Sequence, residues 1–118
     1  MDFIAELGFD VKQGKGQEFQ RFLAENESKF AAALPDGVEY IGTYGVIYSS
    51  EKHAGAYRQF LRYDSYAAQD AMAAAMKEDE TFAALVDAWG EFIDLERGAD
   101  WSNGLYKAVT DLSIWSHG

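Results

Sequence analysis

The sequence predicts an α+β domain in which a four-stranded antiparallel sheet carries two helices on one face. Apolar residues alternate with a period of two in four segments, and they recur with a helical period in two others. These segments follow one another in the order strand, helix, strand, strand, helix, strand. No linker, repeat or low-complexity tract interrupts them, so residues 1–118 are expected to form a single domain.

The first strand is predicted over residues 3–11, because its odd positions are apolar. These positions are Phe3, Ala5, Leu7, Phe9 and Val11. A turn at Gly14-Lys15-Gly16 leads into a first helix, which ends at Pro35-Asp36-Gly37. Its apolar stripe comprises Phe19, Phe22, Leu23, Phe30 and Leu34.

A hairpin is predicted next. Residues 38–49 are rich in β-branched and aromatic side chains, residues 49–55 form a polar loop, and residues 56–63 alternate again. In this third strand one phase holds the apolar residues and the other is mixed. The apolar phase contains Tyr57, Leu61 and Tyr63, and the mixed phase contains Arg58, Phe60 and Arg62.

The second helical region has an interruption. Asp64 and Ser65 offer capping oxygens before an alanine-rich stretch, and the apolar stripe breaks at residues 77–80 and restarts at Phe82. This pattern predicts a long helix that is kinked or capped again near Asp79. Residues 94–103 are predicted to form a loop. Residues 105–115 are predicted to form the fourth strand, with Tyr106 facing the helices and Lys107 facing away.

This order of elements is the ferredoxin-like split βαβ arrangement, in which the first strand lies between the third and fourth. The sheet face opposite the helices then carries both aromatic and charged residues, which is unusual for a face left in water. We therefore expect a second copy to cover it and to enclose a pocket. The predicted pocket residues are Glu6, Asp10, Tyr44, Arg58, Phe60, Arg62, Lys107, Asp111 and Trp115.

Two segments carry a resemblance to a known family. Residues 60–65 (Phe-Leu-Arg-Tyr-Asp-Ser) lead into residues 67–72 (Ala-Ala-Gln-Asp-Ala-Met), and Glu80-Thr81-Phe82 opens the second helical piece. In these features the chain resembles the dimeric α/β barrel superfamily, nearest its antibiotic-biosynthesis monooxygenase-like branch. The resemblance implies a ferredoxin-like fold and a homodimer. Relatives commonly carry a histidine where this chain has Met72, so neither an imidazole base nor an imidazole heme ligand is available there. We therefore expect no cofactor.

Composition excludes further classes of function. The formal net charge of -10 disfavours nucleic acid and anionic membrane surfaces as partners. The chain has no cysteine, and its histidines, His53 and His117, are not set among other ligands at metal spacing, so no metal site is predicted. The absence of a long apolar run and of a basic leader favours a cytoplasmic location.

Two hypotheses for the function remain open. The first is a cofactor-independent enzyme that oxygenates or isomerises a small hydrophobic or aromatic metabolite in the barrel cavity, with Glu6 as the candidate general base. The second is a non-enzymatic homodimeric module that binds a ligand or serves assembly. Cross-strand ion pairing is the more common role for strand charges such as Glu6 and Arg58, and the sequence does not distinguish it from ligand binding.

Overall fold

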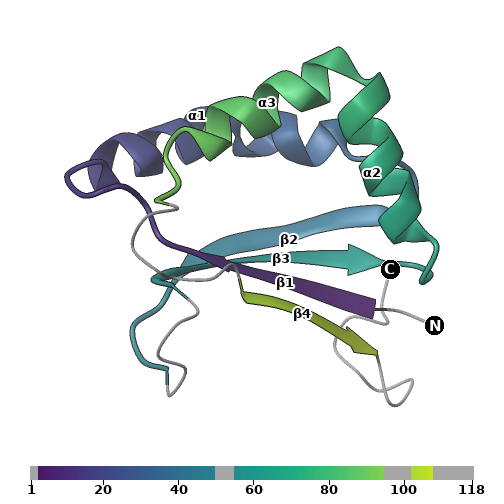
Figure 1. Cartoon of the computed structure of the whole chain (residues 1–118), viewed down its shortest axis with the longest axis horizontal. Helices are drawn as coiled ribbons and strands as arrows, with labels where there is room; N and C mark the ends of the chain where they lie inside the picture. The colour runs from purple at the N-terminus through teal and green to yellow at the C-terminus, as the bar shows by residue number, and fades with distance from the viewer. Residues whose placement is uncertain (1–2, 50–54, 95–101, 108–118) are drawn as a thin grey trace.

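The structure is a computed structural model that describes residues 3–49, 55–94 and 102–107. Its elements are β1 (Phe3–Phe9), α1 (Gly16–Ala33), β2 (Val38–Gly45), β3 (Tyr57–Tyr63), α2 (Ala68–Glu78), α3 (Glu80–Gly90) and β4 (Ser102–Lys107). The strands form one antiparallel sheet in the order β2-β3-β1-β4, and the three helices cover one face of it (Figure 1). The predicted fold class and strand order are confirmed.

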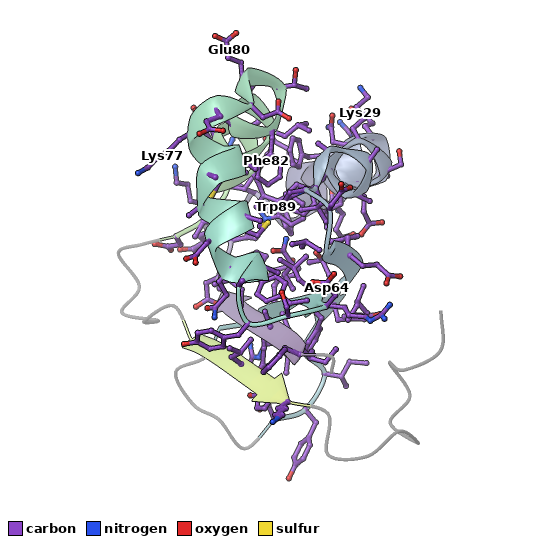
Figure 2. All side chains as sticks on the ribbon, turned by 90° about the vertical axis from the view of Figure 1, so that its right-hand side faces the viewer. Lys29, Asp64, Lys77, Glu80, Phe82 and Trp89 are labelled. Carbon is purple, nitrogen blue, oxygen red and sulfur yellow. The ribbon has the colours of Figure 1, made fainter. Side chains whose placement is uncertain are left out.

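The core between the helices and the sheet is largely aromatic. Phe19 of α1 and Phe82 of α3 are fully buried, and the Trp89 ring lies 5.8 Å from that of Phe19 and 5.2 Å from that of Phe30, measured between centroids. Figure 2 shows Phe82 and Trp89 in the interior, whereas Lys77 and Glu80 point outward. Tilted and edge-on ring contacts of this kind add to the stability that burial provides.

Asp79 divides the second helical region, as predicted. Its backbone is extended, with φ -99° and ψ 104°, which ends α2. Its Oδ1 atom accepts a hydrogen bond of 3.1 Å from the backbone N–H of Phe82, so Asp79 is the N-cap of α3.

The predicted cap of α2 is wrong. The N-cap residue is Ala67, and no side chain caps the helix. The Asp64 carboxylate lies instead against Gly37, which has a φ of +88° in the turn before β2, and the Asp64 N–H donates to the Gly37 carbonyl oxygen over 2.9 Å. Asp64 thus fastens this turn to the end of β3, and a side chain at position 37 would collide with it.

The prediction for the fourth strand is wrong in its start and in its facing. β4 begins at Ser102, inside the predicted loop, and the part predicted beyond Lys107 lies outside the described residues. Tyr106 pairs with Ile4, and Lys107 pairs with Phe3. Directly opposed residues in an antiparallel pair point to the same face. Tyr106 therefore lies on the face away from the helices, and Lys107 lies on the helix-covered side.

Candidate functional site

The sheet face opposite the helices, here called the open face, carries a bonded polar cluster at its centre. The Arg58 Nε atom lies 3.4 Å from Glu6 Oε2, and the Tyr106 hydroxyl donates to Glu6 Oε1 over 2.7 Å. The side chains of Glu6 and Arg58 are only 14% and 8% exposed. Arg58 also donates to the carbonyl oxygens of Gly55 and Tyr57. The structure therefore brings together two predicted pocket residues, Glu6 and Arg58, as a cross-strand ion pair.

The other predicted residues of β2 and β3 lie on the same face, where Phe60 pairs with Glu6, Arg62 with Ile4 and Tyr44 with Arg58. Arg62 Nη1 contacts Glu39 Oε2 at 2.8 Å, and the Glu39 side chain is 64% exposed, so this pair contributes little stability. The ring of Tyr44 meets that of Phe60 edge-on at 5.8 Å. The prediction omitted Tyr106, because the fourth strand was assigned the opposite phase.

Four predicted pocket residues do not join this cluster. The Asp10 carboxylate accepts a hydrogen bond of 2.7 Å from the Ala56 N–H, where it fastens the loop that precedes β3. Lys107 lies on the other side of the sheet, as its pairing with Phe3 requires. Asp111 and Trp115 lie outside the described residues, as do the two histidines.

A second candidate site lies between the sheet and the helices. Two cavities of about 340 Å³ and about 250 Å³ lie there and share Leu7, Gln59 and Met72, and we call them together the helix-side cleft. The larger is also lined by Ala5, Glu6, Leu61, Tyr63, Gln69, Gly104 and Leu105. The smaller is also lined by Phe30, Met76, Phe82, Val86, Trp89, Gly90 and Ile93. The smaller cavity is therefore almost entirely apolar.

Gln59 is the central residue of the helix-side cleft. It is only 7% exposed, and its pairing with Leu7 directs its side chain toward the helices. Within the described part of the chain, its side-chain amide has no hydrogen-bond partner. The amide atoms are not sealed off from solvent, because they line the cleft, where water or a ligand can reach them. The sequence contained a signal for it, because Gln59 is the one strongly polar residue in the apolar phase of the third strand.

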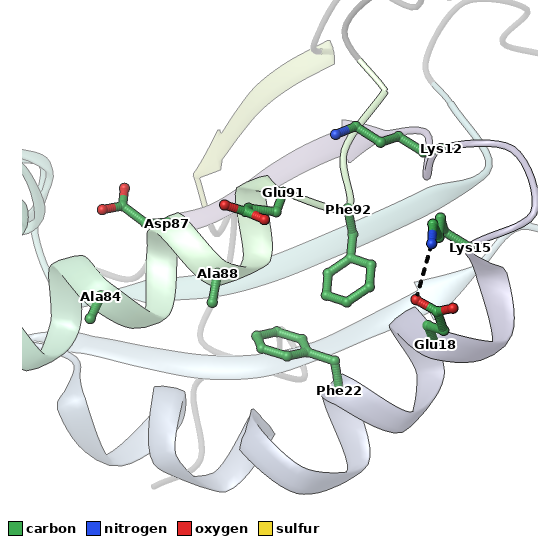
Figure 3. Close-up of a pocket in the computed structure, with 9 residues that line it drawn as sticks. All are labelled: Lys12, Lys15, Glu18, Phe22, Ala84, Asp87, Ala88, Glu91 and Phe92. Atoms are coloured by element: carbon green, nitrogen blue, oxygen red, sulfur yellow. Dashed lines mark hydrogen bonds and ion pairs between the residues drawn. The ribbon is translucent and has the colours of Figure 1, made fainter.

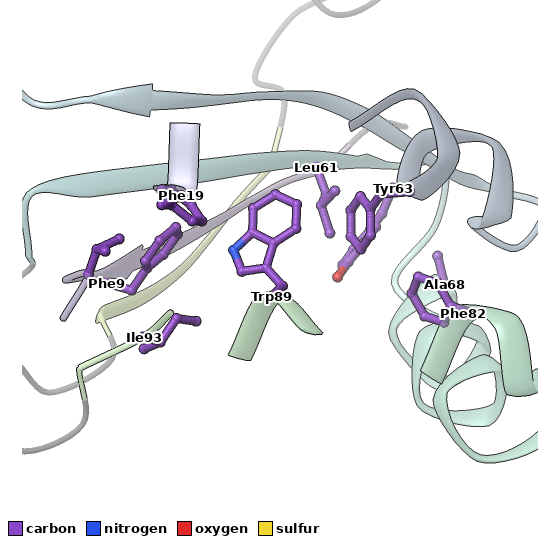
Figure 4. Packing of buried hydrophobic residues seen from close by; sticks show 10 residues of the cluster. Phe9, Phe19, Leu61, Tyr63, Ala68, Phe82, Trp89 and Ile93 are labelled. Atoms are coloured by element: carbon purple, nitrogen blue, oxygen red, sulfur yellow. The ribbon is translucent and has the colours of Figure 1, made fainter. Parts of the chain in front are cut away.

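Tyr63 adds a hydroxyl to the lining of the helix-side cleft, and Met72 adds a flexible apolar side chain. A tyrosine hydroxyl is neutral at physiological pH, and burial raises the pKa of Tyr63 further above its ordinary value. Figure 4 shows this hydroxyl extending from β3 toward the helix layer that carries Trp89. Met72 is half-buried and lines both cavities.

Tyr40 is a second phenol with a raised pKa, partly buried and outside the cleft. Its hydroxyl donates to Glu27 Oε2 over 2.6 Å and lies 2.6 Å from Thr43 Oγ1. Burial, together with the hydrogen bond to Glu27, raises the pKa of Tyr40 far above the ordinary value of 10. This contact joins α1 to β2.

An outer groove of about 780 Å³ lies between α1 and α3 (Figure 3). Phe22 and Phe92 form its apolar part, with ring centroids 5.3 Å apart. Lys15 and Glu18 form an ion pair of 3.4 Å at its edge, and both side chains are at least half exposed. Solvated charges of both signs and the absence of a buried polar anchor make this groove a weaker candidate site than the helix-side cleft.

Residues 3–49, 55–94 and 102–107 contain no group of three or more histidine, cysteine, aspartate or glutamate side chains that could hold a metal ion. They also contain no helix long and apolar enough to cross a membrane.

Comparison with known proteins identifies the fold. No family model matches the chain, and no curated protein matches its sequence. Among solved structures, a NIPSNAP family protein from Agrobacterium tumefaciens has a TM-score of 0.70 at 16% identity, and the match covers 98% of this chain and 99% of that one. The chain therefore has the ferredoxin-like fold of these proteins, and the predicted resemblance is confirmed as a likeness of fold.

Two further neighbours represent other branches. A DABB family protein from Mesorhizobium loti has a TM-score of 0.62 at 15% identity, with 92% of this chain and 98% of that one covered. An antibiotic biosynthesis monooxygenase-like protein from Bordetella bronchiseptica has a TM-score of 0.64 at 14% identity, with the same coverage. Identities this low show the fold alone.

Proposed function

We propose that this protein binds a small, largely apolar molecule in the helix-side cleft. The observation that carries the proposal is Gln59, a residue only 7% exposed that lines both cavities and whose amide has no partner among the described residues. A few polar groups set in an apolar cavity are typical of small-molecule sites, where they fix the orientation of the ligand. A bound hydroxyl, carbonyl or amide would satisfy the Gln59 amide and offset the cost of burying it.

The two methionines of the cleft provide the test. Of the three methionines in the chain, Met72 and Met76 line the cleft. With methionine methyl groups labelled with ¹³C, a screen of small aromatic and aliphatic metabolites should yield ligands that shift both signals, which Met72→Leu and Met76→Leu assign. A complete absence of ligands, or ligands that leave both methyl signals unmoved, would refute binding in the cleft.

A homodimer formed through the open face is part of the proposal. Tyr44 and Tyr106 on this face are each 51% exposed, and beyond β2 the side chains of Ile47 and Tyr48 are almost entirely exposed. In Figure 1 the segment after β2 runs below the sheet, away from the helices. Apolar surface arranged in this way is typical of an interface. Sedimentation equilibrium should give twice the chain mass, and a concentration-independent monomer would refute the dimer.

Cofactor-independent conversion of a bound metabolite, by oxygenation or isomerisation, is the second candidate. It is favoured by Glu6, a carboxylate that holds a hydroxyl at 2.7 Å and would lie in the space between two open faces. The candidate base and the Gln59 amide point to opposite faces of the sheet, so binding without turnover is better supported than catalysis.

Product formation or oxygen uptake with a ligand from the screen would test conversion. Glu6→Gln should abolish turnover, whereas Glu39→Gln, in the exposed ion pair with Arg62, should not. Equal turnover in wild type and Glu6→Gln would exclude Glu6 as the base. If no ligand is converted, the remaining function is that of a non-enzymatic homodimeric binding or assembly module.

A further inference from the structure

The described lining of the helix-side cleft contains one charged residue, and its charged group points to the open face instead of into the cleft. That residue is Glu6, whose carboxylate contacts Arg58 and Tyr106 on the open face. Its β1 neighbour Leu7 points to the helices, so Glu6 presents its main chain to the cleft. A charged ligand group inside the cleft would therefore lose its hydration without gaining a counter-charge, which is strongly unfavourable.

The polar side chains that do face the cleft are neutral. Gln59 offers one acceptor oxygen and two donor hydrogens. The raised pKa of Tyr63 keeps its hydroxyl protonated, so it can donate as well as accept. Gln69, at the partly exposed end of the larger cavity, adds a second amide.

We infer that the ligand is an uncharged molecule whose hydroxyl, carbonyl or amide group hydrogen-bonds to Gln59 while its apolar part occupies the smaller cavity. This inference rests on the proposed binding function and specifies the ligand class for that same cleft. Gln59 is the residue that determines specificity, because it is the buried polar group shared by both cavities. A carboxylate is excluded because the described lining of the cleft offers it no counter-charge. An ammonium group is excluded for the same reason, although the net charge of -10 would attract it to the surface.

Three probes of nearly equal shape test the inference on the full-length chain: 2-naphthol, 2-naphthoate and 2-naphthylmethylammonium. Dissociation constants at neutral pH would be measured from the shifts of the Met72 and Met76 methyl signals. We expect 2-naphthol to bind about tenfold or more tightly than either charged probe. Gln59→Leu should weaken 2-naphthol about tenfold or more, whereas Gln20→Leu, at an exposed position of α1, should leave binding unchanged.

The outcomes separate the two proposals. If a charged probe binds as tightly as 2-naphthol, or if Gln59→Leu binds 2-naphthol as well as the wild type does, this inference is wrong and binding in the cleft still stands. If neither these probes nor the metabolite screen yields a ligand that shifts the methyl signals, the proposed function fails and this inference fails with it; if the screen yields only charged ligands, this inference alone is wrong. Circular dichroism of Gln59→Leu checks that the variant is folded.

Discussion

Replacing Gln59 by leucine should stabilise the ligand-free protein. A fully enclosed amide without a partner would cost about 1 to 3 kcal/mol, and the Gln59 side chain is 7% exposed with no partner for its amide in the described residues. Because the cleft is open enough for water to reach the amide, we take the lower end of this range. Leucine has a similar size and leaves no polar group to satisfy, so the free energy of unfolding should rise by about 1 kcal/mol.

Thermal unfolding provides the assay. For 118 residues, an unfolding entropy of about 2.1 cal/mol/K per residue gives about 250 cal/mol/K in total, so 1 kcal/mol corresponds to an increase in Tm of about 4 °C. Protein concentration must be held constant, because dimerisation makes Tm depend on it. Gln20→Leu is the matched control and should change stability by less than about 0.5 kcal/mol. A decrease in stability of more than about 1 kcal/mol in Gln59→Leu would mean that the amide is already bonded in the folded protein, and the argument for a ligand at Gln59 would fail.

Three further predictions concern the cap, the phenols and the dimer. Asp79→Ala removes the acceptor for the Phe82 N–H and should cost about 1 kcal/mol in urea unfolding; an unchanged midpoint would contradict its role as the cap of α3. The folded state raises the pKa of Tyr40 and Tyr63 above 10, so the unfolded chain loses these protons first as pH rises. The free energy of unfolding should therefore fall above about pH 10, and it should fall less steeply in Tyr40→Phe or Tyr63→Phe; equal slopes in wild type and variants would refute the effect. Ile47→Asp should weaken the dimer about tenfold or more in sedimentation experiments without changing the circular dichroism spectrum, and an unaltered dimer would place the interface elsewhere.

The sequence predicted the parts of the fold that one chain segment determines by itself. Alternation in residues 3–11 and 56–63 gave β1 and β3 their correct facing, and the broken apolar stripe located the cap at Asp79. The prediction for the facing of the fourth strand was wrong because both of its alternating sets of residues mix apolar and polar side chains. Its facing is decided by pairing with β1, which sets Tyr106 beside Ile4, and this is long-range information that periodicity does not contain.

The candidate site was harder to predict than the fold. The sequence correctly placed Glu6 and Arg58 on one face but could not show that they pair with each other. The helix-side cleft results from how α2 and α3 pack over the sheet, and incomplete filling of space leaves no mark in a hydrophobic pattern. Gln59 could have been noticed as a polar residue in an apolar phase, yet its lack of a partner is a property of the folded chain alone.

The chemistry of the helix-side cleft favours recognition over proton transfer. Met72 lines both cavities, and a thioether neither gives nor takes a proton. The amide of Gln59 does not titrate, and burial moves the pKa of Tyr63 away from neutrality, so neither group can exchange a proton readily at physiological pH. Met72 also supplies a flexible apolar surface that can adapt to the shape of a ligand. A general base, if one acts, must therefore come from the open face, where Glu6 lies, and the two faces of β1 would then divide binding from catalysis.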